Sequence, residues 1–347
     1  MNIQQNTLYL LTPGSYVSRD HLTLRVEVGK AAKLSIPIHH LESICVFGPS
    51  TISAPALHLC WEHGVAVNYL SEWGQFQARI TGVADTSVTL RRTHFRAADD
   101  PLKCASIASH IIAGKIQNSR NSLLRAARET DSETERQTIQ NATDALGRQL
   151  ASLGEYEQKP MPLDEIRGVE GMASQLYFSV FSFTLKKQRE VFGFSVRSRR
   201  PPRDRINCML SFIYALVRHD CVAALTSVGL DPFVGFLHVD RANRPSLALD
   251  LMEEFRSWLA DRLAITLINR QQIGTEDFLE REGGVIELTD KGRKQVIRAY
   301  QERKQEKLRH PLLDQTLGIG QMFFIQARIL ARTLRSDLPA YIPFIPK

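Results

Sequence analysis

Several common signatures are missing from this sequence of 347 residues. It has no GxxxxGKS or GxGxxG loop for nucleotide phosphates, no GxSxG elbow for a nucleophilic serine, and no HExxH pair for zinc. Cysteine is scarce and never forms a CxxC pair; the five positions are Cys45, Cys60, Cys104, Cys208 and Cys221. This pattern argues against a structural zinc site and against a disulfide framework, and it predicts a reducing compartment.

Targeting segments are also missing. The N-terminal stretch MNIQQNTLYLL lacks the basic region and the small-residue cleavage site of a signal peptide. No apolar run reaches the roughly 18 to 20 residues that cross a bilayer. We therefore expect a cytoplasmic protein.

The composition is that of an ordinary globular protein, with 43% hydrophobic and 23% charged residues. The net charge of +7 favours polyanionic partners such as nucleic acid. Many enzymes that act on small molecules are equally basic, so charge alone does not decide between these classes.

The hydrophobic period changes once along the chain. Residues 6–48 contain short alternating runs such as HLTLRVEV between turn signals, which is typical of half-buried strands. From about residue 99 the period is helical, and we expect helices near 101–129, 132–153, 163–190, 203–227, 246–269, 288–308 and 316–335. The pattern predicts an α+β multidomain protein, with a small β-rich domain at 1–86, a basic linker at 87–99 and a larger all-α domain at 100–347.

Glu170 lies in the segment RGVEGMASQLYF, which we expect to be helical. At 100° per residue it falls inside the edge of an apolar stripe that includes Ile166, Ala173 and Tyr177. A carboxylate on an inward face needs a cation, such as an arginine or a metal ion. Spacing alone leaves a structural salt bridge and a metal ligand equally open.

A basic cluster precedes the next helix. Pro201 and Pro202 hold an extended loop, and Asp204 is placed to cap the helix that follows. The guanidinium groups of this loop suit a DNA phosphate backbone, and they belong to Arg197, Arg199, Arg200, Arg203 and Arg205. Lys186 and Lys187 extend the same track, and a second basic run occupies 291–307. A solvated basic loop and an ordinary exposed helix remain open as alternatives.

A third segment, 229–256, contains His238 in a Gly/Pro-broken turn and Asp250 and Glu253 on the helix that follows. Taken singly, such acids usually face water, and such a histidine usually belongs to the core. Together with Glu170 they form a mixed oxygen and nitrogen set that suits Mg²⁺ or Mn²⁺. A metal ion so held fits phosphodiester chemistry.

Four motifs occur in order: EGMASQLYF at 170–178, RRPPRDRIN at 199–207, GLDPFVGFLH at 229–238 and SLALDLMEEFR at 246–256. In these motifs the sequence closely resembles the Cas1 family, the integrases of CRISPR spacer acquisition. The N-terminal NTLYLLTPGSYVSRD and HHLESICVFG and the C-terminal GQMFFIQARILARTL resemble the same family, in particular its subtype I-C branch.

The resemblance implies that Glu170, His238 and Glu253 bind a divalent metal and that Asp250 assists at the same site. It also implies a homodimer formed through the β-rich domains, and a complex with Cas2, a small ferredoxin-like partner that bridges two dimers. The implied reaction is transesterification: a 3′-hydroxyl of a short DNA attacks a phosphodiester at the edge of a repeat and displaces its 3′-oxygen.

Three alternatives share parts of this evidence. A stand-alone structure-selective nuclease would use the same ligands without a bridging partner. A non-catalytic scaffold would bind DNA without metal chemistry. A small-molecule metallohydrolase would ignore DNA, and the basic clusters argue against it.

Overall fold

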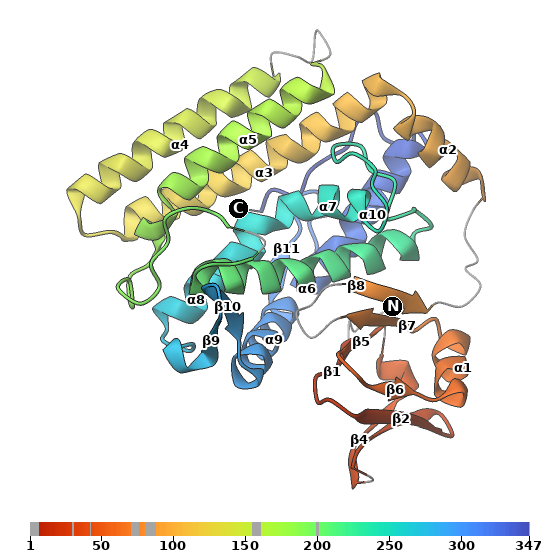
Figure 1. Cartoon of the computed structure of the whole chain (residues 1–347). Helices are drawn as coiled ribbons and strands as arrows, with labels where there is room; N and C mark the ends of the chain where they lie inside the picture. The colour runs from red at the N-terminus through yellow and green to blue at the C-terminus, as the bar shows by residue number, and fades with distance from the viewer. Residues whose placement is uncertain are drawn as a thin grey trace. The chain divides into compact units, whose positions relative to one another are not determined.

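The structure is a computed structural model that describes residues 7–29, 31–41, 43–70, 76–80, 88–154, 161–198 and 201–346 (Figure 1). The chain forms two compact units, Met1–Ser87 and Val88–Lys347. The first unit is rich in strands and the second is mostly helical, as the change of hydrophobic period predicts.

Two four-stranded sheets make up the first unit. One has the order β1-β5-β7-β8, with bounds Thr7–Leu10, Ser43–Phe47, Ala66–Leu70 and Phe76–Ile80. The other has the order β4-β3-β2-β6, with bounds Ala31–Pro37, Thr23–Val28, Ser15–Asp20 and Thr51–Ile52. A short 3₁₀ turn, η1 (Ile38–His40), and helix α1 (Ala54–Glu62) complete the unit. Helix α1 begins after Ser53, whose hydroxyl accepts from the Ala56 N–H at 3.4 Å.

The core of this unit follows from strand alternation. Val17 pairs with Val26 across β2 and β3, and Leu24 pairs with Ile36 across β3 and β4. Val17, Leu24 and Ile44 are completely buried. Period-2 placement therefore brings these apolar side chains to one side of each sheet, where they pack together.

The second unit contains eleven helical segments among the described residues. They are α2 (Val88–Ala98), α3 (Pro101–Glu129), α4 (Glu133–Gly154), α5 (Leu163–Ser179), η3 (Phe181–Thr184), α6 (Arg205–Ser227), α7 (Ser246–Met252), α8 (Arg262–Asn269), η6 (Thr275–Asp277), α9 (Asp290–Gln305) and α10 (Ile319–Leu334), not counting two distorted turns described below. Helices α3, α4 and α5 lie side by side (Figure 1). The unit is not wholly helical, because two short hairpins interrupt it: β9–β10 (Phe278–Arg281 with Val285–Leu288) and β11–β12 (Lys307–Arg309 with Thr316–Gly318).

Residues 87–99, predicted as a linker, are largely the helix α2 of the second unit. Leu90, His94 and Ala97 recur at helical spacing and are buried. His94 Nε2 is 2.9 Å from the carbonyl oxygen of Val234. The arginines that suggested a linker lie on the exposed face of the helix. The segment is therefore an amphipathic helix whose apolar positions were overlooked among its basic residues.

The segment 246–269 is helical throughout but irregular. After α7 the chain makes a 3₁₀ turn, η4 (Glu253–Phe255), and a π-helical turn, η5 (Arg256–Asp261), before α8. Such changes of winding rotate successive side chains out of the regular 100° sequence. Asp250, Glu253, Glu254 and Asp261 are all buried, and even an ideal helix would place them within an arc of about 100°.

Helix α6 differs from the expectation that no segment is long and apolar enough to cross a membrane. Its 23 residues, Arg205–Ser227, meet both conditions. However, 78% of its apolar window is buried inside the structure. Helix α6 is therefore the core helix of the second unit, which explains why it is hydrophobic on nearly all sides.

Candidate metal centre

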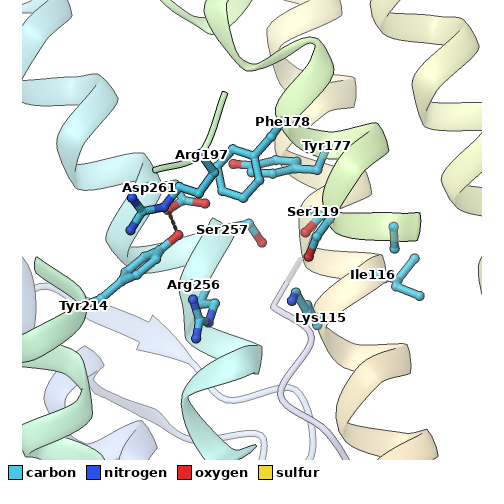
Figure 2. Close-up of a pocket in the computed structure, with 12 residues that line it drawn as sticks. Lys115, Ile116, Ser119, Tyr177, Phe178, Arg197, Tyr214, Arg256, Ser257 and Asp261 are labelled. Atoms are coloured by element: carbon cyan, nitrogen blue, oxygen red, sulfur yellow. Dashed lines mark hydrogen bonds between the residues drawn. The ribbon is translucent and has the colours of Figure 1, made fainter. Parts of the chain in front are cut away.

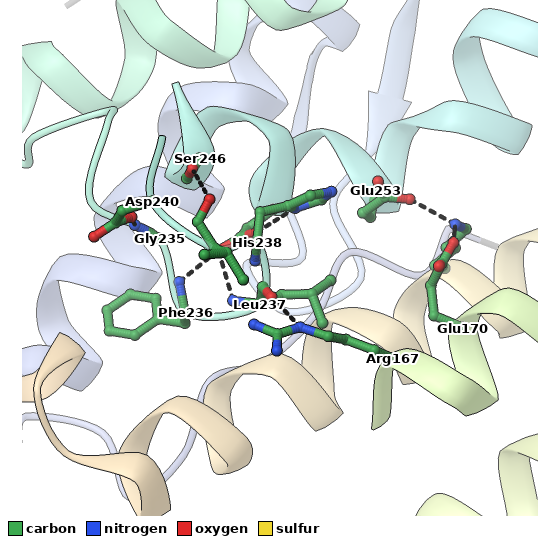
Figure 3. Close-up of polar contacts among 12 residues, drawn as sticks. Arg167, Glu170, Gly235, Phe236, Leu237, His238, Asp240, Ser246 and Glu253 are labelled. Carbon is green, nitrogen blue, oxygen red and sulfur yellow. Dashed lines mark hydrogen bonds and ion pairs between the residues drawn. The ribbon is translucent and has the colours of Figure 1, made fainter. Parts of the chain in front are cut away.

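Two glutamates, which Figure 3 shows facing each other, and one lysine form the centre of the site, and they come from three different helical segments. Glu170 comes from α5, Glu253 from η4 and Lys115 from the middle of α3. The ammonium of Lys115 forms an ion pair with Glu170 Oε1 and lies 2.7 Å from Glu253 Oε2. The inward-facing carboxylate predicted at Glu170 therefore does meet a cation, and that cation is a lysine of the chain itself.

Glu253 is held ionised although it is buried. Its side chain is 3% exposed, and its Oε1 lies 2.9 Å from Arg256 Nε. Burial raises the pKa of this carboxyl, but the neighbouring charges of Arg256 and Lys115 outweigh burial and lower the pKa to about 2. At neutral pH the site thus contains a carboxylate that is charged and desolvated, and Arg256 and Lys115 already compensate its charge.

Asp250 holds the loop that carries His238. Its two carboxylate oxygens accept hydrogen bonds from the backbone N–H groups of Phe236 (2.7 Å), Leu237 (3.0 Å) and His238 (3.0 Å). The His238 ring contributes a fourth contact, because Nδ1 lies 2.6 Å from Asp250 Oδ1. Asp250 is completely buried, so its role is to support the histidine rather than to face solvent.

Glycine is required at position 235 by this close packing. A Cβ atom there would lie 2.8 Å from Ser246 Cβ and 2.9 Å from Asp250 Oδ2. Arg167 secures the other side of the loop, since its Nε donates to the Leu237 carbonyl at 2.8 Å. The loop is therefore fixed from both sides before any ligand arrives.

The three predicted ligands do not form a ready-made metal cage. Among residues 7–29, 31–41, 43–70, 76–80, 88–154, 161–198 and 201–346, no group of three or more His, Cys, Asp or Glu side chains is placed to hold a metal ion. The physical reason is that Lys115 lies between the two glutamates, while His238 is held through Nδ1 by Asp250.

The donor set nevertheless fits a divalent cation. The space between the two glutamates is already selective for positive charge. Glu253 Oε2 lacks a well-aligned hydrogen bond within the described part of the chain. Because Asp250 can only accept, Nδ1 of neutral His238 carries the proton and Nε2 keeps its lone pair, which is the usual arrangement of a metal-binding histidine. In Figure 3 the His238 ring extends toward the side on which Glu253 lies.

A pocket adjoins the centre (Figure 2). Lys115, Arg197 and Arg256 bring three cations to its wall, and Asp261 lies among them. Burial raises the pKa of Asp261 to about 6, against the opposing effect of the Tyr214 hydroxyl, which donates to it at 2.6 Å. The guanidinium of Arg256 stacks over the Tyr214 ring at 4.7 Å.

The structure separates the predicted DNA-binding residues into three groups. Arg197 points inward, where its Nη1 donates to Asn207 Oδ1 at 2.6 Å and its guanidinium lies 5.3 Å from the Tyr214 ring centre. Arg203 and Lys187 are exposed, whereas Lys186 and Arg205 are half-buried. The remaining two, Arg199 and Arg200, lie outside the described residues.

Lys186 and Arg205 also have internal attachments. Burial lowers the pKa of Lys186, and Arg205 Nη1 donates to the Val191 carbonyl at 3.0 Å. The basic run at 291–307 likewise contains internal partners. Arg298 Nε donates to Glu302 Oε1 at 3.0 Å, and Lys304 is buried against Asp220 at 2.8 Å. These contacts favour the alternative of an ordinary charged helix for much of α9.

Sequence reasoning missed Lys115 and Arg256. Lys115 had a signal, because it interrupts an apolar stripe of α3 at helical spacing from Ile111 and Ile112. A lysine on such a stripe needs a buried anion, just as Glu170 needed a buried cation. Arg256 closes the motif at 246–256, but its role depends on the distorted turns that no periodicity predicts.

The glutamate next to Glu253 faces a different environment. Glu254 is completely buried. Its carboxylate accepts from the Tyr341 hydroxyl (2.5 Å), the Phe344 N–H (2.7 Å) and Gln326 Nε2 (3.0 Å). Asn118, one turn beyond Lys115, donates to both the Glu254 and the Phe344 carbonyls at 2.8 Å. The C-terminal segment thus ties α3 to η4 beside the site.

Comparisons with known proteins agree with this architecture. The model of the family described as CRISPR associated protein Cas1 matches residues 8–302. A CRISPR-associated endonuclease Cas1 from Moorella thermoacetica is 46% identical over 99% of both chains. A second, from Chlorobaculum tepidum, is 42% identical over 98% of both chains.

Solved structures share the fold. A Cas1 protein from Thermotoga maritima superposes with a TM-score of 0.78 at 21% identity, covering 99% of this chain and 100% of its own. A casposase bound to integration product gives 0.80 at 23% identity, covering 97% and 93%. A chain of a Cas6-RT-Cas1–Cas2 complex gives 0.81 at 24% identity, covering 99% of this chain and 36% of its own.

The fold and the relatives are those of the nucleases and integrases of CRISPR adaptation. The chain belongs to the Cas1 family of CRISPR-associated proteins. The resemblance seen in the four sequence motifs is thereby confirmed, whereas the assignment to subtype I-C stays a prediction.

Proposed function

We propose that this chain is the endonuclease and integrase of CRISPR adaptation, and that Glu170, His238 and Glu253 hold its divalent metal. Enzymes of this family are generally divalent-metal dependent. The observation that carries the proposal is the convergence of two carboxylates on one cation, beside a histidine whose tautomer is set by Asp250. The hard donor set favours Mg²⁺ or Mn²⁺.

The bound metal would supply Lewis-acid stabilisation of charge at the reacting phosphate. The chain's own residues prepare that position. Arg256 and Lys115 keep Glu253 ionised, and Ser174 donates to Glu170 Oε1 at 2.8 Å. Asp250 keeps the proton of His238 on Nδ1, so that Nε2 is presented as a donor atom.

The reaction is a direct transfer between oxygens. The 3′-hydroxyl oxygen of the incoming DNA forms a bond to phosphorus and loses its proton to solvent. The bond from phosphorus to the departing 3′-oxygen breaks, and that oxygen takes up a proton from solvent. No covalent enzyme intermediate is needed. All five cysteines are buried, and burial raises the pKa of Tyr177 and Tyr214, so these side chains are poor candidates for nucleophiles.

We further propose that exposed Arg203 and Lys187 contact DNA phosphates, together with Arg199 and Arg200. The expected protein partners are Cas2 and a second copy of this chain joined through the β-rich domain at 1–86. The fully buried free cysteines fit the reducing cytoplasm that the sequence predicts.

A strand-transfer assay tests the function. The purified chain and its Cas2 partner are mixed with Mg²⁺ or Mn²⁺, a short duplex with free 3′-hydroxyls and a supercoiled plasmid that carries a repeat. Joined product should require metal, the 3′-hydroxyl and His238. His238→Ala should abolish joining. His110→Ala, the same change on α3 at a half-buried residue whose Nδ1 lies 2.7 Å from the Ser106 carbonyl of its own helix, should not.

The alternatives give different results in the same assay. Metal-dependent cutting without joining would favour a stand-alone structure-selective nuclease. DNA binding that survives Glu170→Ala, with no metal-dependent chemistry in the wild type, would favour a scaffold. If His238→Ala joins DNA as well as the wild type, the proposed centre is wrong.

A further inference from the structure

Lys115 is a buried charge that the proposed reaction does not use. It lies on α3 and is 8% exposed, and its ammonium contacts carboxylates from α5 and from η4. Burying a lysine is costly unless anions compensate it. The position of this side chain therefore reflects the charge of the two glutamates.

The charges around the glutamates balance without any added ion. Glu253 meets Arg256 through Oε1 at 2.9 Å and Lys115 through Oε2 at 2.7 Å. Glu170 meets Lys115 and the Ser174 hydroxyl through Oε1. Two carboxylates thus face two cations, and a divalent ion that entered this balanced set would meet like charge at close range.

The two cations are anchored differently. The guanidinium of Arg256 is stacked on the Tyr214 ring at 4.7 Å, and its side chain is only 14% exposed. Lys115 has a flexible four-carbon stem and lines the adjoining pocket (Figure 2), which offers its ammonium a place to withdraw. Of the two cations, Lys115 is therefore the one whose side chain can move out of the space between the glutamates.

We propose that Lys115 is a built-in competitor for the divalent cation: its ammonium occupies the space between Glu170 and Glu253 and must leave before the metal binds. Lys115 thereby keeps the glutamate pair together without metal and sets a weak metal affinity. This inference rests on the proposed metal ligands. Lys115 is a positioning residue in this role, since it acts on the carboxylates rather than on the DNA.

Metal binding to the intact chain tests the proposal without measuring catalysis. Mn²⁺ is titrated into protein, and free Mn²⁺ is followed by electron paramagnetic resonance. Lys115→Met should bind Mn²⁺ about tenfold more tightly than the wild type, because one like charge is removed at close range. Lys115→Arg retains the charge and should show no gain. Lys103→Met, the same change at an exposed position of α3, should bind as the wild type does.

Loss of Lys115 leaves buried Glu253 facing half-buried Glu170 without the cation between them and can prevent folding. Lys115→Gln keeps hydrogen-bond donors without the charge and serves as the second variant. The melting temperature of each variant is also measured with and without Mn²⁺. Competition predicts that Mn²⁺ raises the melting temperature more in Lys115→Met or Lys115→Gln than in the wild type.

The outcomes separate this proposal from the one on which it rests. If both neutral variants bind Mn²⁺ no more tightly than the wild type, or gain no extra thermal stabilisation, Lys115 is not a competitor. If Glu253→Gln binds Mn²⁺ as tightly as the wild type, the proposed ligand set itself is wrong. If Lys115→Met binds Mn²⁺ tightly and the double variant Lys115→Met/Glu253→Gln does not, the result supports both the competing role of Lys115 and the proposed ligand set.

Discussion

Replacing Asp250 by asparagine isolates the contribution of one charged oxygen to the site. The substitution preserves the shape of the side chain but turns one acceptor into a donor. Each Asp250 oxygen receives two contacts: Oδ2 from the Phe236 and Leu237 N–H groups, and Oδ1 from the N–H and Nδ1 of His238. Whichever way the amide is oriented, two donors lose their acceptor.

The magnitude follows from burial. Asp250 is completely buried, so water cannot replace the lost acceptor. A buried donor left without a partner costs about 1 to 3 kcal/mol, and two such donors give an expected loss of about 3 kcal/mol in the free energy of unfolding. Because a carboxylate also orients the histidine, divalent metal affinity should fall by about 10- to 100-fold.

Urea denaturation and Mn²⁺ titration measure the two effects separately. Asp240→Asn is the matched control, since Asp240 is exposed and accepts only a 3.3 Å contact from the Gly235 N–H. It should lose less than about 0.5 kcal/mol. The reasoning is refuted if Asp250→Asn is as stable as Asp240→Asn, or if it is destabilised but binds Mn²⁺ with unchanged affinity.

Two further predictions concern pH and DNA. Burial raises the pKa of Glu254 from its usual value of 4.5 to about 7, so the folded state binds this proton more tightly than the unfolded chain does. This contribution to the free energy of unfolding is fully present below about pH 4.5 and is lost as pH rises through about 7, an effect of roughly 3 kcal/mol. Urea denaturation across this range should show the decrease in stability. In Glu254→Gln the free energy of unfolding should depend less on pH. Exposed Arg203 and Lys187 should each contribute about one unit to the slope of log affinity against log salt. Fluorescence polarisation of Arg203→Ala and Lys187→Ala tests this, with ion-paired Arg298→Ala as the control; unchanged slopes would contradict the predicted phosphate contacts.

Local patterns predicted most of the helices and failed where winding changed. The expected helix at 101–129 coincides with α3, Pro101–Glu129, because a long apolar stripe and an Asp100 cap define it. The expected helix at 163–190 ends at Ser179, and the one at 246–269 is broken by 3₁₀ and π turns. These changes depend on tertiary packing, which periodicity does not contain.

Sequence reasoning could identify the acidic residues of the candidate site but not its cationic residues. Glu170 lies on a regular helix, so its inward position could be deduced from spacing. Its partner Lys115 is 55 residues earlier in the chain, and only the packing of α3 against α5 brings the two together. The burial of Asp250 was missed for a related reason, since its partners are the backbone of a loop and not a side chain with a recognisable pattern.

The adjacent glutamates of the turn η4 have opposite properties. Glu253 faces Arg256 and Lys115, and these charges lower its pKa to about 2 although it is buried. Glu254 faces only the neutral donors of Tyr341, Gln326 and Phe344, which do not offset burial, and its pKa rises to about 7. One residue therefore stays charged toward the metal centre while the next anchors the C-terminal segment to the core. Successive side chains of a 3₁₀ turn lie about 120° apart, so the two glutamates of η4 face different partners.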